Sequence, residues 1–169
     1  MMVSARLKLA PMSKVFHVAL VLACVFRGLS AQAVAITRAE GRLLFLKSGS
    51  YTWGEVSAGQ VLGAGDQLKT ANNARATVTF DDGSRVDLNA GSAFILQEAA
   101  PQASELQLQI GSLRAWISKS LNRRFRVRTP TAVCSVRGTE FSVDVGQDGG
   151  THVQMFNGLL AVADKSGNE

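Results

Sequence analysis

Apolar and polar residues alternate with a period of two over most of the chain after residue 33. The clearest examples are residues 74–80, 105–110 and 141–145. Because successive side chains of a strand point to opposite faces, each segment predicts a strand with one buried and one solvent face. No window of 11 or more residues carries a convincing helical stripe. We therefore expect an all-β fold, a single domain of short, mostly antiparallel strands in a stacked sheet or solenoid-like sandwich.

Turn-forming residues separate these predicted strands at short intervals. Two predicted turns, Ser48-Gly49-Ser50 and residues 81–84, each separate one apolar segment from the next. The strongest hairpin signal is Asn157-Gly158, which is typical of a type I′ turn. Glycine also precedes an apolar segment at three places, Gly41, Gly111 and Gly158. This weak echo fits strands that enter successive layers of a stacked sheet, and it fits equally well a simple preference for glycine where strands begin.

Residues 125–143 are the most informative stretch, with two alternating strands around a Thr129-Pro130 break and a turn at Arg137-Gly138-Thr139-Glu140. A glycine between strands usually marks positive φ or a close backbone approach. Arg137 lies in an otherwise apolar segment, which predicts a buried guanidinium. Since a buried guanidinium is tolerated only when it is paired, Asp66 and Glu140 are its expected partners.

Residues 1–33 have the pattern of a removed export signal, with basic residues, an apolar run and Ala31-Gln32-Ala33 as the cleavage site. Met1, Met2 or Met12 can serve as its start. Residues 21–24 also approach a lipobox, so a lipoprotein anchored through Cys24 is the alternative to a periplasmic or secreted protein. We expect a lead-in at residues 34–40, the β-domain at 41–163 and a tail at 164–169. No later segment is apolar and long enough to span a membrane.

Removal of the signal changes the meaning of the charge. The full chain has 18 basic and 13 acidic residues, whereas the mature part keeps 14 basic and 13 acidic residues and a net charge of +1. The basic character of the whole sequence is therefore no sign of nucleic-acid binding. Cys134 is the one cysteine left after cleavage, so no intramolecular disulfide can form, and a buried structural thiol is expected.

Residues that carry out catalysis are scarce. His152 is the one histidine outside the signal, and it reads as an ordinary strand residue; pairing with Cys134 would need a contact that the sequence does not predict. Asp81, Asp82 and Asp87 read as turn and strand residues rather than a Ca²⁺ site. We expect no enzyme, no catalytic residue, no cofactor and no metal site.

A basic cluster offers the best candidate for binding. Alternation places Arg124, Arg126 and Arg128 on one face of a strand, where they could bind carboxylates or phosphates of an envelope polymer, a lipid head group or a partner protein. The competing interpretation is a solvated face whose like charges discourage aggregation at a sheet edge. Trp53, Trp116 and Tyr51 are candidates for stacking on sugars, although Trp116 is expected in the core.

The order of these motifs resembles the FecR-type domain, named for the periplasmic regulator of ferric citrate transport. The resemblance runs from about Gly41 to Val162 and rests on segments 65–70, 74–76, 82–84, 91–92, 111–113, 125–130, 136–141 and 157–158, together with Ala132. It implies an extracytoplasmic all-β domain, which in the sensor members receives a signal from an outer-membrane transporter and passes it inward. The family pattern marks positions of the fold, so it implies no active-site residue.

The expected function follows from both lines of reasoning. The chain is predicted to be an exported binding or structural module of the bacterial cell envelope, linked to sensing or signalling, whose partner is an envelope protein or a second copy of itself. In the sensor members a cytosolic segment precedes this domain, and here a signal directly precedes it, so the full signalling role is not carried over. The alternative function is binding of peptidoglycan, another glycan or an anionic polymer, and an enzyme of unrecognised type is the third, least favoured hypothesis.

Overall fold

The computed structural model describes residues 33–120 and 123–164, which form strands and no helix. The strands are β1 (Val34–Glu40), β2 (Leu43–Leu46), β3 (Gly54–Val56), β4 (Val61–Leu62), β5 (Gln67–Thr70), β6 (Arg75–Phe80), β7 (Arg85–Leu88), β8 (Ala93–Ala100), β9 (Ala103–Trp116), β10 (Arg124–Arg128), β11 (Ala132–Val145) and β12 (Thr151–Asp164). They belong to one 12-stranded sheet, and every pair is antiparallel except the parallel pair of β9 and β10. The predicted all-β class is confirmed.

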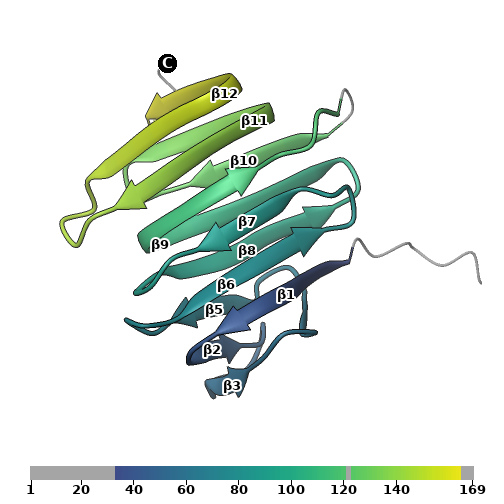
Figure 1. Ribbon diagram of the computed structural model, residues 1–169, viewed down its shortest axis with the longest axis vertical. Helices are drawn as coiled ribbons and strands as arrows, with labels where there is room; N and C mark the ends of the chain where they lie inside the picture. The colour runs from purple at the N-terminus through teal and green to yellow at the C-terminus, as the bar shows by residue number, and fades with distance from the viewer. Residues whose placement is uncertain (1–32, 121–122, 165–169) are drawn as a thin grey trace, which may run out of the picture. The chain divides into compact units, whose positions relative to one another are not determined.

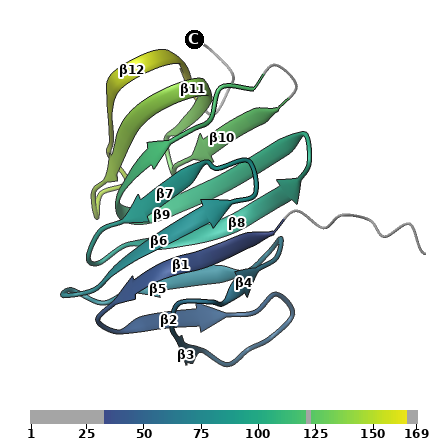
Figure 2. The same cartoon turned by 45° about the vertical axis from the view of Figure 1, so that its right-hand side comes forward.

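This sheet folds over on itself into two facing layers (Figures 1 and 2). The first layer contains β4, β1, β6 and β7, and the second contains β3, β2, β5, β8 and β10. The three 14-residue strands belong to both layers. Residues 103–110 of β9 pair with β8, whereas residues 113–116 pair with β7. β11 likewise pairs with β10 before its middle and with β9 after it.

A glycine with positive φ lies where each long strand passes between the layers. These are Gly111 (φ 88°), Gly138 (φ 61°) and Gly158 (φ 99°). Gly41 (φ 72°) has the same place between β1 and β2. Side chains other than glycine rarely adopt this conformation, so the glycines permit the sharp change of direction. The glycine echo in the sequence therefore marks strands that change layer.

The predicted Asn157-Gly158 hairpin is wrong. Both residues lie inside β12, which pairs with β11 on either side of them, and the register shifts between Arg137 and Glu140. A type I′ turn and a bulged corner both need a residue that tolerates positive φ, so the local sequence does not distinguish them. The turns at 48–50 and 81–84 are present as predicted, since Gly49 and Gly83 have φ of 78° and 79°.

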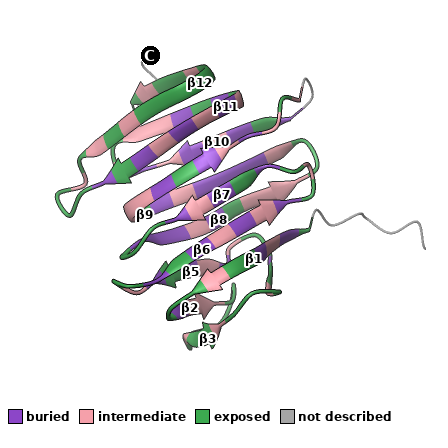
Figure 3. Cartoon of the chain, viewed as in Figure 1, coloured by how far each residue is buried: buried purple, intermediate pink, exposed green. Residues whose placement is uncertain are grey.

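The core lies between the two layers. Phe80 of the first layer and Phe125 of the second meet edge to face, with ring centroids 5.3 Å apart. Alternating side chains of both layers fill the rest, and Figure 3 shows them as buried bands across the central strands. Residues 34–40, expected as a lead-in, form β1 and contribute Val34 and Ile36 to this core. Cys134 is fully buried and free, as expected.

The Thr129-Pro130 break separates β10 from β11 as predicted, and the Thr129 hydroxyl accepts the Ala132 N–H at 2.9 Å. The expected signal at 1–33 with Cys24, and the tail beyond Asp164, lie almost entirely outside the described residues. Within 33–120 and 123–164, no helix has the length and apolar character needed to cross a membrane.

Candidate functional site

The two ends of the sheet differ in how their edge strands are protected. At one end lie β3 and β4, which contain three and two residues. At the other end, β12 runs for 14 residues and, in the described part of the chain, pairs with β11 alone. An edge strand leaves a row of backbone N–H and C=O groups without partners, and proteins usually limit this by short edges, charges or proline. β12 is long and has no charge and no proline along its middle, where it bends at Gly158.

The side chains of β12 are unusually exposed and apolar. Leu159 is 78 % exposed, Met155 50 %, Phe156 45 % and Val162 41 %. No residue between His152 and Asp164 carries a charge. Figure 3 shows β12 as largely exposed, next to buried positions of β11. A strand with this composition presents backbone hydrogen bonds and apolar side chains together, which is what strand addition by another chain requires.

Arg124, Arg126 and Arg128 lie on the outward face of β10, because Phe125 and Val127 between them are buried. β10 lies between β9 and β11, so these charges do not protect an edge. Glu105 of β9 binds two of them: its carboxylate oxygens lie 3.1 Å from Nε of Arg126 and 3.0 Å from Nε of Arg128. The three arginines are therefore not a uniform row of free cations.

The prediction of a buried, paired Arg137 is wrong. Its side chain is exposed, and its Nε donates a hydrogen bond to the Ser120 carbonyl oxygen at 3.0 Å. Alternation explains the difference, since Val136 takes the buried position and turns Arg137 outward. Neither expected partner contacts it: Glu140 accepts a hydrogen bond from Nε of Arg114 at 3.1 Å, and Asp66 binds backbone groups.

Asp66 and Thr139, two residues of the family pattern, have structural contacts. The buried Asp66 carboxylate accepts the N–H groups of Ser48 at 2.7 Å and Gly63 at 2.8 Å. The buried Thr139 hydroxyl donates to the Leu159 carbonyl oxygen at 2.6 Å, beside the corner at Gly138. These side chains hold loops and corners in place, in agreement with a pattern that marks the fold.

Sequence reasoning missed the burial of Arg123, whose side chain is 6 % exposed. Its Nη1 lies 2.7 Å from a carboxylate oxygen of Asp82 and 3.3 Å from one of Asp81, and its Nη2 donates to Ser104 at 2.7 Å. The adjacent acidic residues of the 81–84 turn were a signal for a cationic partner. Forty residues separate them from Arg123, however, and nothing local to either segment indicates the pairing.

No thiol and imidazole pair is formed. In the ladder of β11 and β12, Cys134 lies opposite Val162, whereas His152 lies opposite Asp144, ten residues further along β11. Burial raises the pKa of the Cys134 thiol to about 11, so the thiolate that a nucleophile requires is scarce near neutral pH. His152 is exposed on β12, as expected of a strand residue.

The aromatic side chains are poorly placed for a shared sugar site with the β10 arginines. Trp116, expected in the core, is half-buried. The guanidinium groups of Arg85 and Arg114 lie 4.1 and 4.9 Å from the centroid of its ring. Tyr51 is fully exposed, and the Lys69 ammonium lies 4.2 Å from the Trp53 ring centroid. Tyr51 and Trp53 both precede β3. Four strands, β2, β5, β8 and β9, separate β3 from β10, which is a distance of about 24 Å at the usual spacing of strands.

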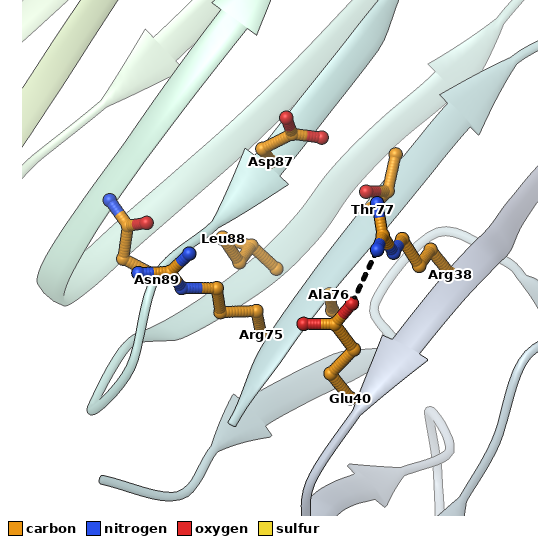
Figure 4. A pocket seen from close by; sticks show the side chains of 8 residues that line it. All are labelled: Arg38, Glu40, Arg75, Ala76, Thr77, Asp87, Leu88 and Asn89. Carbon is orange, nitrogen blue, oxygen red and sulfur yellow. Dashed lines mark ion pairs between the residues drawn. The ribbon is translucent and has the colours of Figure 1, made fainter. Parts of the chain in front are cut away.

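A depression of about 200 Å³ lies on the outer face of the first layer between β1, β6 and β7 (Figure 4). Its polar wall is mixed in charge, with Arg38 paired to Glu40 at 2.6 Å and Arg75 and Asp87 on the neighbouring strands. In the part of the chain that the structure covers, no three metal-binding side chains come together. This surface has the composition of an ordinary solvated sheet face.

The described residues form a two-layered β-domain with one long open edge. The model of the family described as FecR protein matches residues 66–161, and the chain belongs to this family. The family assignment that the order of motifs predicted is thereby confirmed.

The solved structures that match this chain include two crystal structures of a proposed anti-sigma factor from Parabacteroides distasonis. Both are 21 % identical in sequence to this chain, cover 61 % of it and have a TM-score of 0.45. The chain spans 57 % and 56 % of the length of these two neighbours. At this identity and TM-score, the similarity carries no functional argument. Comparison with curated proteins gives no match.

Proposed function

We propose that the chain is an exported, non-enzymatic protein-binding module of the bacterial cell envelope that takes part in sensing or signalling. Membership of the FecR family supports this role, because its sensor members receive signals from envelope proteins. The signal pattern at residues 1–33 supports a periplasmic or secreted location, with attachment through Cys24 as the alternative.

The observation that carries the proposal is the open edge of β12. Its partner is an envelope protein that contributes an extended segment. Strand addition gives affinity through main-chain hydrogen bonds and specificity through alternate side chains. Because Met155, Phe156 and Leu159 are exposed and uncharged, the added segment has apolar residues at alternate positions and no charge at its centre. A charged segment would lose hydration without gaining an ionic partner.

Peptidoglycan or another glycan is the weaker candidate. A glycan site at Arg124, Arg126 and Arg128 would need an exposed aromatic ring in a groove beside these arginines. The rings of Tyr51 and Trp53 lie near the other end of the second layer instead. On β12 the exposed ring of Phe156 has the Arg114 guanidinium group 4.5 Å from its centroid, and the other exposed large side chains, Met155, Leu159 and Val162, are apolar.

Site-specific photo-crosslinking in cells that export the full chain tests the proposal. The photoreactive residue replaces Leu159 on β12 in one strain and Val61 on β4 in the control, since both side chains are more than half exposed. We expect a discrete adduct with one envelope protein from position 159 alone. Ala161→Lys, an added charge on the same edge, should abolish that adduct without unfolding the protein.

Equal adducts from both positions, or none from position 159, would overturn the proposal. An adduct between two copies of this chain would retain β12 as the binding edge but replace the envelope protein by self-association. If isolated cell-wall material retains the wild-type protein and the Ala161→Lys variant equally, the result would instead favour the glycan function.

A further inference from the structure

A depression of about 310 Å³ lies on the outer face of the second layer, between β10 and β11. Among its lining residues are Arg124, Arg126, Ser135 and Arg137. The antiparallel register aligns Phe125 with Val136 and Arg126 with Ser135, so Arg124 and Arg137 are placed opposite each other. Like charges directly opposite in a sheet repel each other and destabilise the pairing. This pair therefore needs a compensating negative charge.

The protein does not provide that charge within its described residues. Glu105, the nearest acidic residue of β9, is bound to Arg126 and Arg128. In 33–120 and 123–164, neither Arg124 nor Arg137 has an ion pair with a carboxylate. The two unpaired guanidinium groups give the depression a local charge of about +2, close to the opposite of a phosphate group at neutral pH.

The donors are also partly oriented. Nε of Arg137 is held by the Ser120 carbonyl oxygen, which leaves its terminal amino groups for another acceptor. Arg126 is fixed at its Nε by Glu105, and Ser135 adds a hydroxyl between the strands. Planar guanidinium groups match the oxygen geometry of phosphate through paired hydrogen bonds, which is why arginine is favoured in such sites.

We infer that this depression is a binding site for a phosphate group, held mainly by Arg124 and Arg137. The inference does not depend on strand addition at β12. The phosphate group belongs either to a small soluble molecule or to a lipid head group, because the depression is open at the surface and both sources present the same chemistry.

Titration of the purified mature protein tests this site in two arms at low ionic strength. In the first, inorganic phosphate is the ligand and calorimetry measures its affinity. In the second, phosphatidylcholine vesicles are compared with vesicles that also contain phosphatidic acid. The variant R124Q/R137Q should lose at least about tenfold in affinity. R42Q/R75Q is the matched control, since it removes the same charge from exposed arginines elsewhere.

Binding in the first arm assigns a soluble phosphate, and binding in the second arm alone assigns a lipid head group; either result supports the site. Added salt should weaken binding, because the site is exposed. Three results would overturn the inference: no binding in either arm, equal losses in R124Q/R137Q and R42Q/R75Q, or succinate binding as tightly as phosphate. Thermal unfolding shows that the affinities refer to folded protein: R42Q/R75Q should unfold near the wild-type temperature, and R124Q/R137Q at that temperature or above it, because it removes the opposed like charges.

Discussion

Gly138 and Gly158 face each other where β11 and β12 pass from one layer of the sheet to the other. A Cβ atom on Gly158 would lie 2.4 Å from the carbonyl oxygen of Gly138, closer than real Cβ atoms approach. Both residues also have positive φ, of 61° and 99°. The corner thus depends on two glycines twenty residues apart, and it brings both halves of β12 alongside β11.

Gly158→Ala should therefore destabilise the domain strongly, because backbone strain and a clash with backbone atoms add together. We expect the free energy of unfolding to fall by about 3 kcal/mol or more. Gly49→Ala is the control: it has φ of 78° but nothing within 4 Å of the added Cβ, so a loss of about 1–2 kcal/mol is expected. Urea denaturation of both variants measures the difference, and equal losses would contradict the close approach at the corner.

Asp66→Asn should weaken the domain by about 1–3 kcal/mol. The carboxylate accepts two backbone N–H groups, from Ser48 and Gly63, whereas an amide presents one acceptor oxygen and an NH₂ group to the same two donors. Asp148→Asn is a suitable comparison, because Asp148 is exposed and binds the Gly150 N–H in a surface turn. If both substitutions lower the free energy of unfolding by the same amount, the burial of Asp66 does not contribute to stability.

The burial of Cys134 predicts a specific dependence of stability on pH. Burial raises the thiol pKa in the folded state from about 9 to about 11, so the unfolded chain loses its proton first. The stabilising contribution is complete below pH 9 and declines as the pH rises from 9 to 11. Cys134→Ala should lack this decline. Denaturation at several pH values, compared between wild type and the variant, measures it; parallel curves would show that the thiol ionises equally in both states.

Arg123→Met should lower stability by about 2 kcal/mol or more, since it removes a buried cation and leaves Asp82 and Ser104 without their partner. The matched control is Arg42→Met, where the ion pair with Glu55 is exposed on both sides and a change within about 0.5 kcal/mol is expected. Thermal unfolding compares the two. Similar effects would mean that the Arg123 contacts are as weak as a surface pair.

The sequence predicted the strands well because half-buried strands carry their own alternation, as in β6 and β10. It predicted poorly wherever a contact joins distant segments. Gly158 has the same local signal in a hairpin and in a corner, and the difference lies in Gly138, on another strand. Arg123 and Asp82 likewise meet only because β6 and β10 lie in facing layers.

The candidate sites were predictable to different degrees. The outward face of Arg124, Arg126 and Arg128 follows from alternation alone. The neutralising role of Glu105, and the opposition of Arg124 and Arg137, required the order of strands. The open edge could not be found in the sequence either, since β12 becomes an edge only through its position in the sheet.

Amide hydrogen exchange along β12, with and without the partner captured at position 159, tests strand addition most directly. In an antiparallel pair, alternate N–H groups of an edge strand point away from its neighbour and exchange freely. If a partner adds a strand, these alternate amides between Val153 and Ala163 should slow by at least about tenfold, while β3 and β4 stay unchanged. Unchanged exchange along β12, or protection confined to another surface, would contradict the account.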